Sequence, residues 1–433
     1  MDGTRILVVG QGGREHAIVR ALHDSPEHPR LYVAPGSAGM EDVAERVPLA
    51  GSDAAGIAAW SRRNSIDLVV IGPEAPLQLG LADQLRASGI ATVGPGSLGA
   101  KLETSKRYAK ELLSRLGLPT ARFRVAESPE AAEAALSEFD LPVVIKADGL
   151  AAGKGVVIAT TRDEALATID VWMRRRVLGD AGAALILEEC LTGEEASLLA
   201  LTDGERWVLF PPARDHKRVG DGDTGPNTGG MGVFAPARAP SREEAAAIAR
   251  RVIDPVLRAQ REAGEPYRGI LYLGLMLTKT GPSVLEFNAR FGDPETQAVL
   301  PLLDEDLLPL FRAAAAGALP PERHGTFVAH HGAAVCVVLA SKGYPERPET
   351  GVLIEGLDKT WPHGIRVFHS GVERHGTRWV TSGGRVLGVT ARAETLERAR
   401  DAAYAAIARI RFDGMHYRRD IAQPPIPIGS ELK

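Results

Sequence analysis

The chain has 433 residues, of which 44% are hydrophobic and 24% charged, and its formal net charge at neutral pH is −4. This length predicts roughly two to four domains, and the charge balance excludes the strongly basic surface that nucleic-acid binding requires. The two cysteines, Cys190 and Cys336, lie in separate apolar stretches, which excludes a disulfide framework and a cysteine metal site.

The N-terminal hundred residues alternate strand-like and helical stretches. Residues 5–9, 31–33 and 68–71 are apolar runs, and residues 54–63 have a helical pattern. This alternation predicts a parallel α/β sheet. The first apolar run is far too short for a signal peptide or a membrane span. We therefore expect a cytoplasmic protein with no membrane contact and no nucleic-acid partner.

A glycine-rich turn, Gly10 to Gly13, follows the first strand and raises the alternative of a dinucleotide-binding oxidoreductase. Such a site needs an acid at the end of the second strand, about 20 residues on, for a ribose hydroxyl. Here the second strand ends in the sequence APGS at residues 34–37, so the acid is missing. Backbone amides at the turn can still bind a single phosphate.

Glu74 lies between Pro73 and Pro76, directly after the strand at residues 68–71. At the carboxyl end of a parallel strand it is placed to accept hydrogen bonds from ribose hydroxyls. The alternative is an exposed loop acid without a ligand.

A second glycine-rich loop, residues 148–155, separates the strand-like runs 143–146 and 156–159. Glycines let backbone amides approach phosphate oxygens, and Lys146 at the end of the first run can add a positive charge. The loop is not a P-loop, because its glycine spacing is one residue short and a strand, not a helix, follows. An ordinary hairpin loop is the alternative.

Residues 215–232 combine six glycines with Asp215, Lys217 and Arg218. A disordered surface loop is one interpretation of this composition. The mixture of glycine, charge and Asn227 favours the other, an active-site lid that orders over substrates.

A predicted hairpin, residues 271–277 and 283–288, ends in Glu286, Asn288 and Arg290. Residues two apart in a strand face the same side, so these three side chains should project together. A carboxylate and an amide oxygen suit Mg²⁺, and Arg290 can neutralise phosphate charge. A solvated hairpin edge is the alternative, which the alternating Leu285 and Phe287 disfavour.

Three helix starts carry capping signals. Ser128 precedes a proline at the first helical position, and two capping boxes pair Thr161 with Glu164 and Ser241 with Glu244. Beyond residue 326 we expect strands at residues 333–339 and 385–389 and a helix at residues 396–410. No histidine stands out as a catalyst.

These motifs, in this order, resemble the ATP-grasp ligases. The more specific similarity is to the phosphoribosylamine–glycine ligase family, the glycinamide ribonucleotide synthetases, and it runs from residue 5 to about residue 420. It is carried by GQGGREHA at residues 10–17, GPEAPL at 72–77, the glycine loop after Lys146, the acidic hinge at 188–197, DHKR at 215–218, DTGPNTGGMG at 223–232 and the segment 286–297.

The resemblance implies an α/β fold with a parallel-sheet N-terminal domain, a two-lobed ATP-grasp domain and a small C-terminal α/β domain. The expected boundaries are residues 1–104 for the N-terminal substrate domain, 105–119 for a connecting helix, 120–191 for the small ATP-grasp lobe, 192–325 for the large lobe and 326–433 for the C-terminal domain.

The resemblance also implies the activity, which is the ATP-dependent ligation of glycine to phosphoribosylamine through glycyl phosphate in de novo purine synthesis. The expected cofactors are ATP and Mg²⁺, with Mn²⁺ as an alternative. We expect a monomer or a weak dimer in transient contact with the upstream amidotransferase. A related ligase for another acid or amine, and a nucleotide sensor without turnover, remain the competing hypotheses.

The implied site residues fall into four groups. Catalytic roles are expected for Lys146, Asp215, Lys217 and Arg290. ATP contacts are expected from Lys106, Lys146, Gly153, Lys154, Gly155, Glu188, Glu189, Cys190, Leu191 and Glu195. Substrate contacts are expected from Gly12, Gly13, Arg14, Glu15, Pro73, Glu74, Arg218, Asn227, Gly292 and Asp293. The metal ligands are expected to be Glu286 and Asn288.

One departure from the wider ATP-grasp pattern concerns the metal. Many of these enzymes carry another metal-binding acid on the strand before Glu286, and residues 271–277 contain none. Either Glu286 serves two metal ions or a second ion is weakly held.

Overall fold

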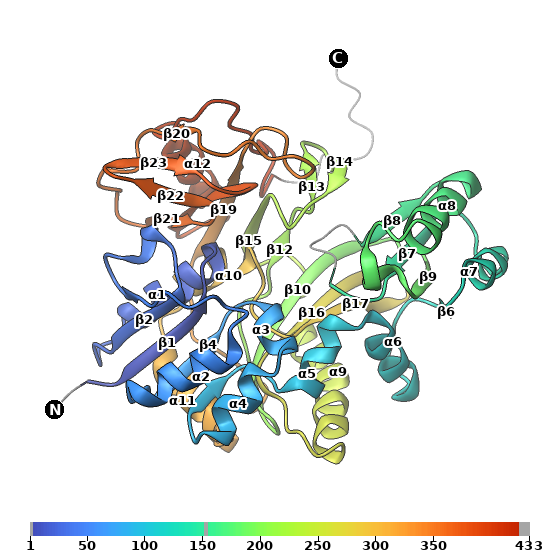
Figure 1. Cartoon of the computed structure of the whole chain (residues 1–433), viewed down its shortest axis with the longest axis horizontal. Helices are drawn as coiled ribbons and strands as arrows, with labels where there is room; N and C mark the ends of the chain where they lie inside the picture. Colours follow the sequence, from blue (N-terminus) through green and yellow to red (C-terminus); the bar gives the residue numbers. More distant parts are fainter. Residues whose placement is uncertain (1–2, 151–154, 424–433) are drawn as a thin grey trace.

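The structure is a computed structural model that describes residues 3–150 and 155–423 (Figure 1). None of the helices within these ranges combines the length and the apolar character that a membrane crossing requires.

The N-terminal sheet is parallel and is covered by helices on both faces. Its strands, in sheet order, are β3 (Glu45–Arg46), β2 (Arg30–Pro35), β1 (Arg5–Gly10), β4 (Leu68–Ile71) and β5 (Ala91–Val93). Helices α1 (Gly13–His23) and α2 (Ala54–Arg63) cover it, so the apolar runs of β1 and β4 are buried. The carboxyl ends of β1 and β4 share one edge, which brings the turn at Gly12 close to Glu74.

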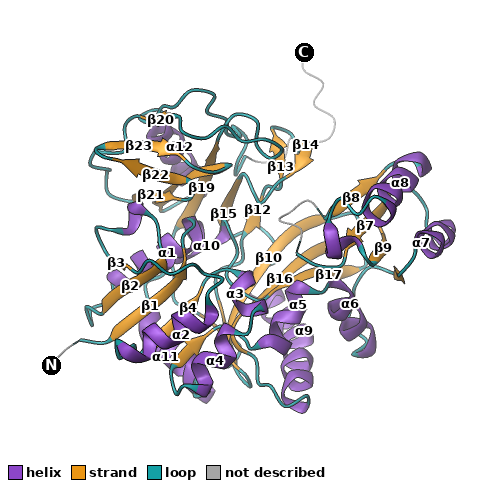
Figure 2. Ribbon diagram, viewed as in Figure 1, coloured by secondary structure: helices purple, strands orange, loops and turns teal. Residues whose placement is uncertain are grey.

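The small lobe is a separate antiparallel sheet with two helices on its outer side, and it projects from the rest of the chain in Figure 2. Pairing of β7 with β8 across the glycine loop confirms the predicted strand–loop–strand arrangement. The lobe consists of β6 (Phe123–Ala126), β9 (Leu185–Glu189), β7 (Val143–Ala147), β8 (Val156–Ala159), α7 (Pro129–Ala135) and α8 (Arg162–Ile169).

The large-lobe sheet carries the hairpin that ends in the predicted metal ligands. Its strands are β17 (Gly281–Asn288), β16 (Arg268–Thr278), β10 (Glu194–Asp203), β11 (Trp207–Leu209) and β18 (Thr326–Phe327). The amphipathic helix α9 (Arg242–Glu262) packs on one face, together with α6 (Lys106–Arg115).

The two strands that flank the glycine-rich segment, β12 (Arg214–Asp215) and β15 (Gly232–Ala235), belong to one sheet with three C-terminal strands. The sheet continues from β15 with β19 (Ala333–Ala340), β24 (Arg385–Ala393) and β21 (Ile365–His369), and α12 (Leu396–Ile407) packs against it. Between β12 and β15 the segment forms a hairpin, β13 (Arg218–Gly220) and β14 (Thr224–Asn227). Arg418 holds this hairpin through an ion pair of 2.6 Å with Asp223. The domain boundary expected at residue 326 stays a prediction.

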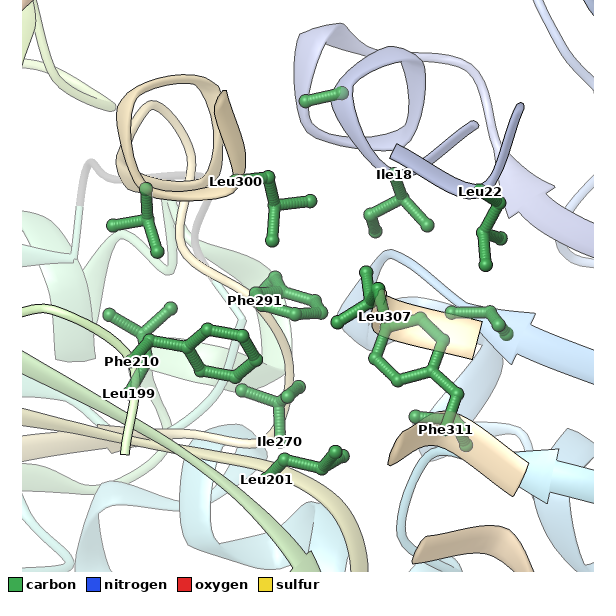
Figure 3. Close-up of a cluster of buried hydrophobic side chains, with 14 of the residues drawn as sticks. Ile18, Leu22, Leu199, Leu201, Phe210, Ile270, Phe291, Leu300, Leu307 and Phe311 are labelled. Atoms are coloured by element: carbon green, nitrogen blue, oxygen red, sulfur yellow. The ribbon is translucent and has the colours of Figure 1, made fainter. Parts of the chain in front are cut away.

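The N-terminal sheet and the large lobe share one hydrophobic core (Figure 3). Ile18 and Leu22 of α1 lie opposite Leu307 and Phe311 of α11 (Leu307–Ala316), and the same cluster continues to Leu199 of β10. Burial of each such side chain contributes about 1.5–3 kcal/mol, so this core holds the two parts in a fixed relation.

The local capping signals are present as predicted. Ser128 caps α7 with a proline in the first turn, and both predicted capping boxes form at the starts of α8 and α9. The predicted α/β architecture is observed: a parallel-sheet N-terminal part is followed by a small lobe, a large lobe and a C-terminal α/β part.

Candidate active site

A cavity of about 440 Å³ lies where the four parts of the chain meet. Each part contributes charged side chains: Glu74 from α3 (Glu74–Gln78), Lys146 from β7, Glu286 from β17 and Arg385 from β24. The cavity brings together twelve of the predicted site residues: Arg14, Glu74, Lys106, Lys146, Gly155, Glu188, Asp215, Lys217, Glu286, Asn288, Arg290 and Asp293.

Two of the predicted residues, Gly153 and Lys154, lie outside the described residues. The remaining predicted residues are described and do not line this cavity: Gly12, Gly13, Glu15, Pro73, Glu189, Cys190, Leu191, Glu195, Arg218, Asn227 and Gly292.

Two of these side chains are engaged elsewhere. Glu15 accepts hydrogen bonds from the amide of Gly12 (2.7 Å) and from Arg14, so it stabilises the glycine turn from inside. Arg218 donates to the carbonyl oxygen of Gly225 within its own hairpin, at 2.8 Å. Substrate contacts from these two residues stay a prediction.

Two lysines share one buried carboxylate at the small-lobe end of the cavity. Oε2 of Glu188 lies 2.8 Å from Nζ of Lys110 and 3.0 Å from Nζ of Lys146, and Lys146 also donates to the carbonyl oxygen of Leu285. Lys110 and Glu188 are only 3% and 1% exposed. Burial lowers the pKa of Lys110 to about 8, although Glu188 opposes this shift.

Lys106 lies one helical turn before Lys110, on the same face of α6. Its Nζ donates to the carbonyl oxygen of Gly149 at the start of the glycine loop, at 3.2 Å. Burial lowers the pKa of Lys106, and Glu286 is the largest opposing charge. Lys106 therefore supplies a cation beside the loop that is expected to bind phosphates.

Glu286 and Asn288 face the cavity from the same side of β17, as the strand period predicts. Burial raises the pKa of Glu286, but Lys217, Lys146 and other cations outweigh this and lower it overall, which favours the carboxylate. Within the described ranges, no group of three or more His, Cys, Asp or Glu side chains forms a metal site by itself. This donor set fits Mg²⁺, which takes one or two carboxylates and completes its shell with substrate phosphates and water.

Arg290 links the end of the large-lobe hairpin to the N-terminal part. Its Nε lies 3.1 Å from Oε2 of Glu74, and its Nη2 lies 2.7 Å from Oε1 of Glu103 on α5 (Ser97–Thr104). Burial lowers the pKa of Arg290, but Glu103 and Glu74 outweigh this and raise it. The guanidinium is therefore charged and fixed in direction.

Arg385 reaches the cavity from the C-terminal sheet. Its Nη2 lies 3.1 Å from Oδ2 of Asp293, and its Nη1 donates to the backbone oxygens of Asp293 and Gly229. Burial raises the pKa of Asp293, but Arg385 and Arg14 outweigh this and lower it. Two loops of the cavity wall are thus held by one side chain.

Asp215 and Lys217 flank the cavity where the glycine-rich segment begins. Lys217 Nζ lies 2.9 Å from Oε2 of Glu195 and 3.8 Å from Oε1 of Glu286. Burial raises the pKa of Asp215 to about 7, with Lys217 opposing and Glu295 adding to the shift. Lys217 therefore connects Glu195 to Glu286, the predicted metal ligand.

Sequence reasoning missed Lys110, Glu103 and Arg385. Only Lys110 had a usable signal, because it lies four residues after Lys106 on a predicted helix. Glu103 and Arg385 reach the site through contacts with residues far away in the chain, which no local pattern indicates.

Comparison with known proteins places these features in a family. Three family models, described as the N domain, the ATP-grasp (A) domain and the C domain of phosphoribosylglycinamide synthetase, match residues 4–103, 104–296 and 334–424. A phosphoribosylamine–glycine ligase of Caulobacter vibrioides is 47% identical over 426 residues, which cover 97% of this chain and 98% of that protein. The trifunctional purine biosynthetic protein adenosine-3 of Gallus gallus is 44% identical over 99% of this chain and 43% of its own length.

Solved structures agree with the family models. The crystal structure of a phosphoribosylamine–glycine ligase from Thermotoga maritima matches with a TM-score of 0.82 and 36% identity, covering 96% of this chain and all of that one. A biotin carboxylase domain of Hydrogenobacter thermophilus matches with a TM-score of 0.75 at 17% identity, covering 96% and 92%, and shows the fold alone. The chain belongs to the phosphoribosylglycinamide synthetase family and is an ATP-grasp ligase.

Proposed function

We propose that this chain ligates glycine to 5-phospho-β-D-ribosylamine at the expense of ATP, giving glycinamide ribonucleotide, ADP and phosphate in de novo purine synthesis. The observation that carries this proposal is that Lys106 and Lys146, Glu286 with Asn288, Arg290, and Glu74 of the N-terminal part all line one cavity. It joins a phosphate-binding end to a sugar-binding end.

The reaction has two steps. A carboxylate oxygen of glycine attacks the γ-phosphorus of ATP, the bond to the bridging oxygen of ADP breaks, and glycyl phosphate forms. The neutral amine of phosphoribosylamine then attacks the acyl carbon, phosphate leaves, and the new amide loses one proton. An enclosed site matters because water would otherwise hydrolyse the acyl phosphate.

The protein accelerates these steps by positioning and by charge. Lys106 and Lys146 hold the phosphates of ATP, and Arg290 neutralises the charge that develops on the transferred phosphoryl group. Glu286 and Asn288 would hold Mg²⁺, or Mn²⁺ in its place, which supplies further positive charge to the phosphates. Lys217 orients the glycine carboxylate beside them, with Asp215 as its neighbour.

The nucleoside of ATP lies at the small-lobe end in this proposal. The backbone of Glu189, Cys190 and Leu191 contacts the adenine, and Glu195 accepts from the ribose hydroxyls. Oε1 of Glu188 is buried and has no hydrogen-bond partner among the described residues. It is therefore an available acceptor for the 6-amino group of the base.

Phosphoribosylamine lies at the N-terminal end. Its phosphate binds the amides of Gly12 and Gly13 at the start of α1, where the helix dipole favours an anion, with Arg14 beside them. Glu74, after Pro73, accepts from the ribose hydroxyls. Further contacts from Arg218, Asn227, Gly292 and Asp293, and phosphate contacts from Gly153, Lys154 and Gly155, belong to the same proposal.

We also propose that the protein acts in the cytoplasm as a monomer or a weak dimer. The amine substrate is unstable, which supports a transient contact with the amidotransferase that produces it.

The test is ADP release with ATP, Mg²⁺, glycine and freshly made phosphoribosylamine, each omitted in turn. We expect release only with all four, and glycinamide ribonucleotide by mass spectrometry. Release with another acid or amine would keep the chemistry and change the substrate. ATP binding without release under any combination would favour a nucleotide sensor.

A further inference from the structure

Lys110 is a buried charged residue at the cavity that neither step of the reaction uses. Besides the ion pair with Glu188, its Nζ donates to Oγ1 of Thr120 at 2.7 Å and lies 5.7 Å from the ring centre of Phe123. Thr120 in turn donates to the carbonyl oxygen of Val284 at 2.8 Å. These contacts fix the ammonium group between α6, the small lobe and β17.

Glu188 depends on this arrangement for its direction. Both lysines contact the same oxygen, Oε2, which leaves Oε1 buried and without a partner among the residues described. A buried polar atom without a hydrogen bond is costly, so such an atom at a ligand cavity indicates a contact that the ligand completes. Two nearby side chains of α6, Ala109 and Leu113, line the cavity as apolar neighbours.

The exposed donor or acceptor at position 6 of a purine decides whether the base can bind beside Glu188. Adenine presents a donating amino group at position 6, whereas guanine presents an accepting oxygen there. A carboxylate oxygen held in one direction accepts from the first and repels the second. Its selectivity is lost if the carboxylate turns or if its charge is left uncompensated.

We propose that Lys110 is a positioning residue that sets the nucleobase selectivity of the site by holding Glu188. This inference rests on the proposed function, because it takes ATP as the nucleotide that enters the cavity. Lys110 touches no reacting atom, so its removal should change which nucleotide binds more than how fast a bound ATP reacts.

The experiment compares the binding of ATP, GTP and purine riboside triphosphate, which lacks the 6-amino group, to the wild-type chain and to Lys110→Met. Met has similar length and no charge. Because a hydrogen bond to a charged group is worth about tenfold or more in affinity, we expect wild type to bind ATP at least about tenfold more tightly than the analogue. In Lys110→Met this ratio should fall to about two, with kcat at saturating ATP within about threefold of wild type.

Matched variants separate positioning from general damage. Lys101→Met changes an exposed lysine of α5 and should leave the ratio unchanged. Thr120→Val keeps the charge of Lys110 but removes one of its hydrogen bonds, and it should give an intermediate ratio even if Lys110→Met does not fold. An unchanged ratio in the folded variants, with ATP and the analogue weakened equally, would overturn the proposal.

Failure of the proposed function would look different. Binding is measured without glycine or the amine, so the nucleotide ratios do not depend on turnover. Wild-type protein that binds ATP selectively but releases no ADP with both substrates would refute the ligase reaction and leave the role of Lys110 standing.

Discussion

Nη2 of Arg290 lies 2.7 Å from Oε1 of Glu103, so the end of the large-lobe hairpin is held by an acid of the N-terminal part. Both side chains are largely buried, and a second oxygen of Glu103 accepts from the amide of Ala289 at 2.7 Å. One carboxylate thus holds both the backbone and the side chain at the strand end. Removing its charge should therefore disturb catalysis without touching any substrate.

Glu103→Gln keeps the shape of the side chain and removes its charge. We expect kcat to fall by about tenfold to a hundredfold, because small displacements of a charge at the reacting phosphoryl group are costly. The free energy of unfolding should fall by about 1–3 kcal/mol. Turnover and denaturant unfolding measure the two effects. Glu111→Gln, which removes an exposed partner of Arg107, is the control and should stay within about 0.5 kcal/mol of wild type.

Glu286→Gln tests the proposed metal ligand. The change removes the carboxylate that, with Asn288, would hold Mg²⁺, and we expect kcat to fall by about a hundredfold or more. The fold should persist, because Glu286 lies at the cavity and its ion pair with Lys217 is long, at 3.8 Å. Circular dichroism and steady-state turnover check this. Near-normal turnover at saturating Mg²⁺ would contradict the assignment of Glu286 as a metal ligand.

The buried carboxyl group of Asp215 should make the stability of the fold depend on pH. Burial raises its pKa to about 7 in the folded chain, against 3.8 ordinarily. Between these values the folded chain keeps a proton that the unfolded chain has lost, so this residue weakens folding increasingly as the pH rises. Asp215→Asn removes the effect. Its Tm relative to wild type should be higher at pH 8 than at pH 4, and a difference that does not change with pH would contradict the assignment.

The parts of the fold that sequence could predict are those that local chemistry decides. The capping boxes of Thr161 with Glu164 and of Ser241 with Glu244 are contacts within one helical turn. The residue types at two nearby positions were therefore sufficient to predict each of them. The same holds for Glu286 and Asn288, whose common direction follows from the strand period.

The parts that sequence could not predict depend on distant pairings. β15, which closes the glycine-rich segment, pairs with β19, about one hundred positions later, because its buried residues need a second strand. Arg385 and Glu103 enter the site in the same way. Nothing beside them in the sequence differs from an ordinary surface charge.

Arg385→Gln tests whether the C-terminal sheet contributes to substrate binding. The change removes the ion pair with Asp293, at 3.1 Å, and the contact with Gly229, so two loops of the cavity wall lose their common anchor. Because Asp293 is assigned to the phosphoribosylamine end, KM for that substrate should rise by about tenfold, a loss of about 1.4 kcal/mol. KM for ATP should change by less than about threefold, because the proposed nucleoside site is at the opposite end.

Arg378→Gln on β23 (Arg378–Thr381) is the matched control, since this arginine is exposed and does not line the cavity. It should leave both constants unchanged. If Arg385→Gln instead raises KM for ATP most, the two ends of the cavity are assigned in the wrong order. Equal rises in both constants, with a lower Tm, would mean that Arg385 stabilises the cavity as a whole and has no preference for one substrate.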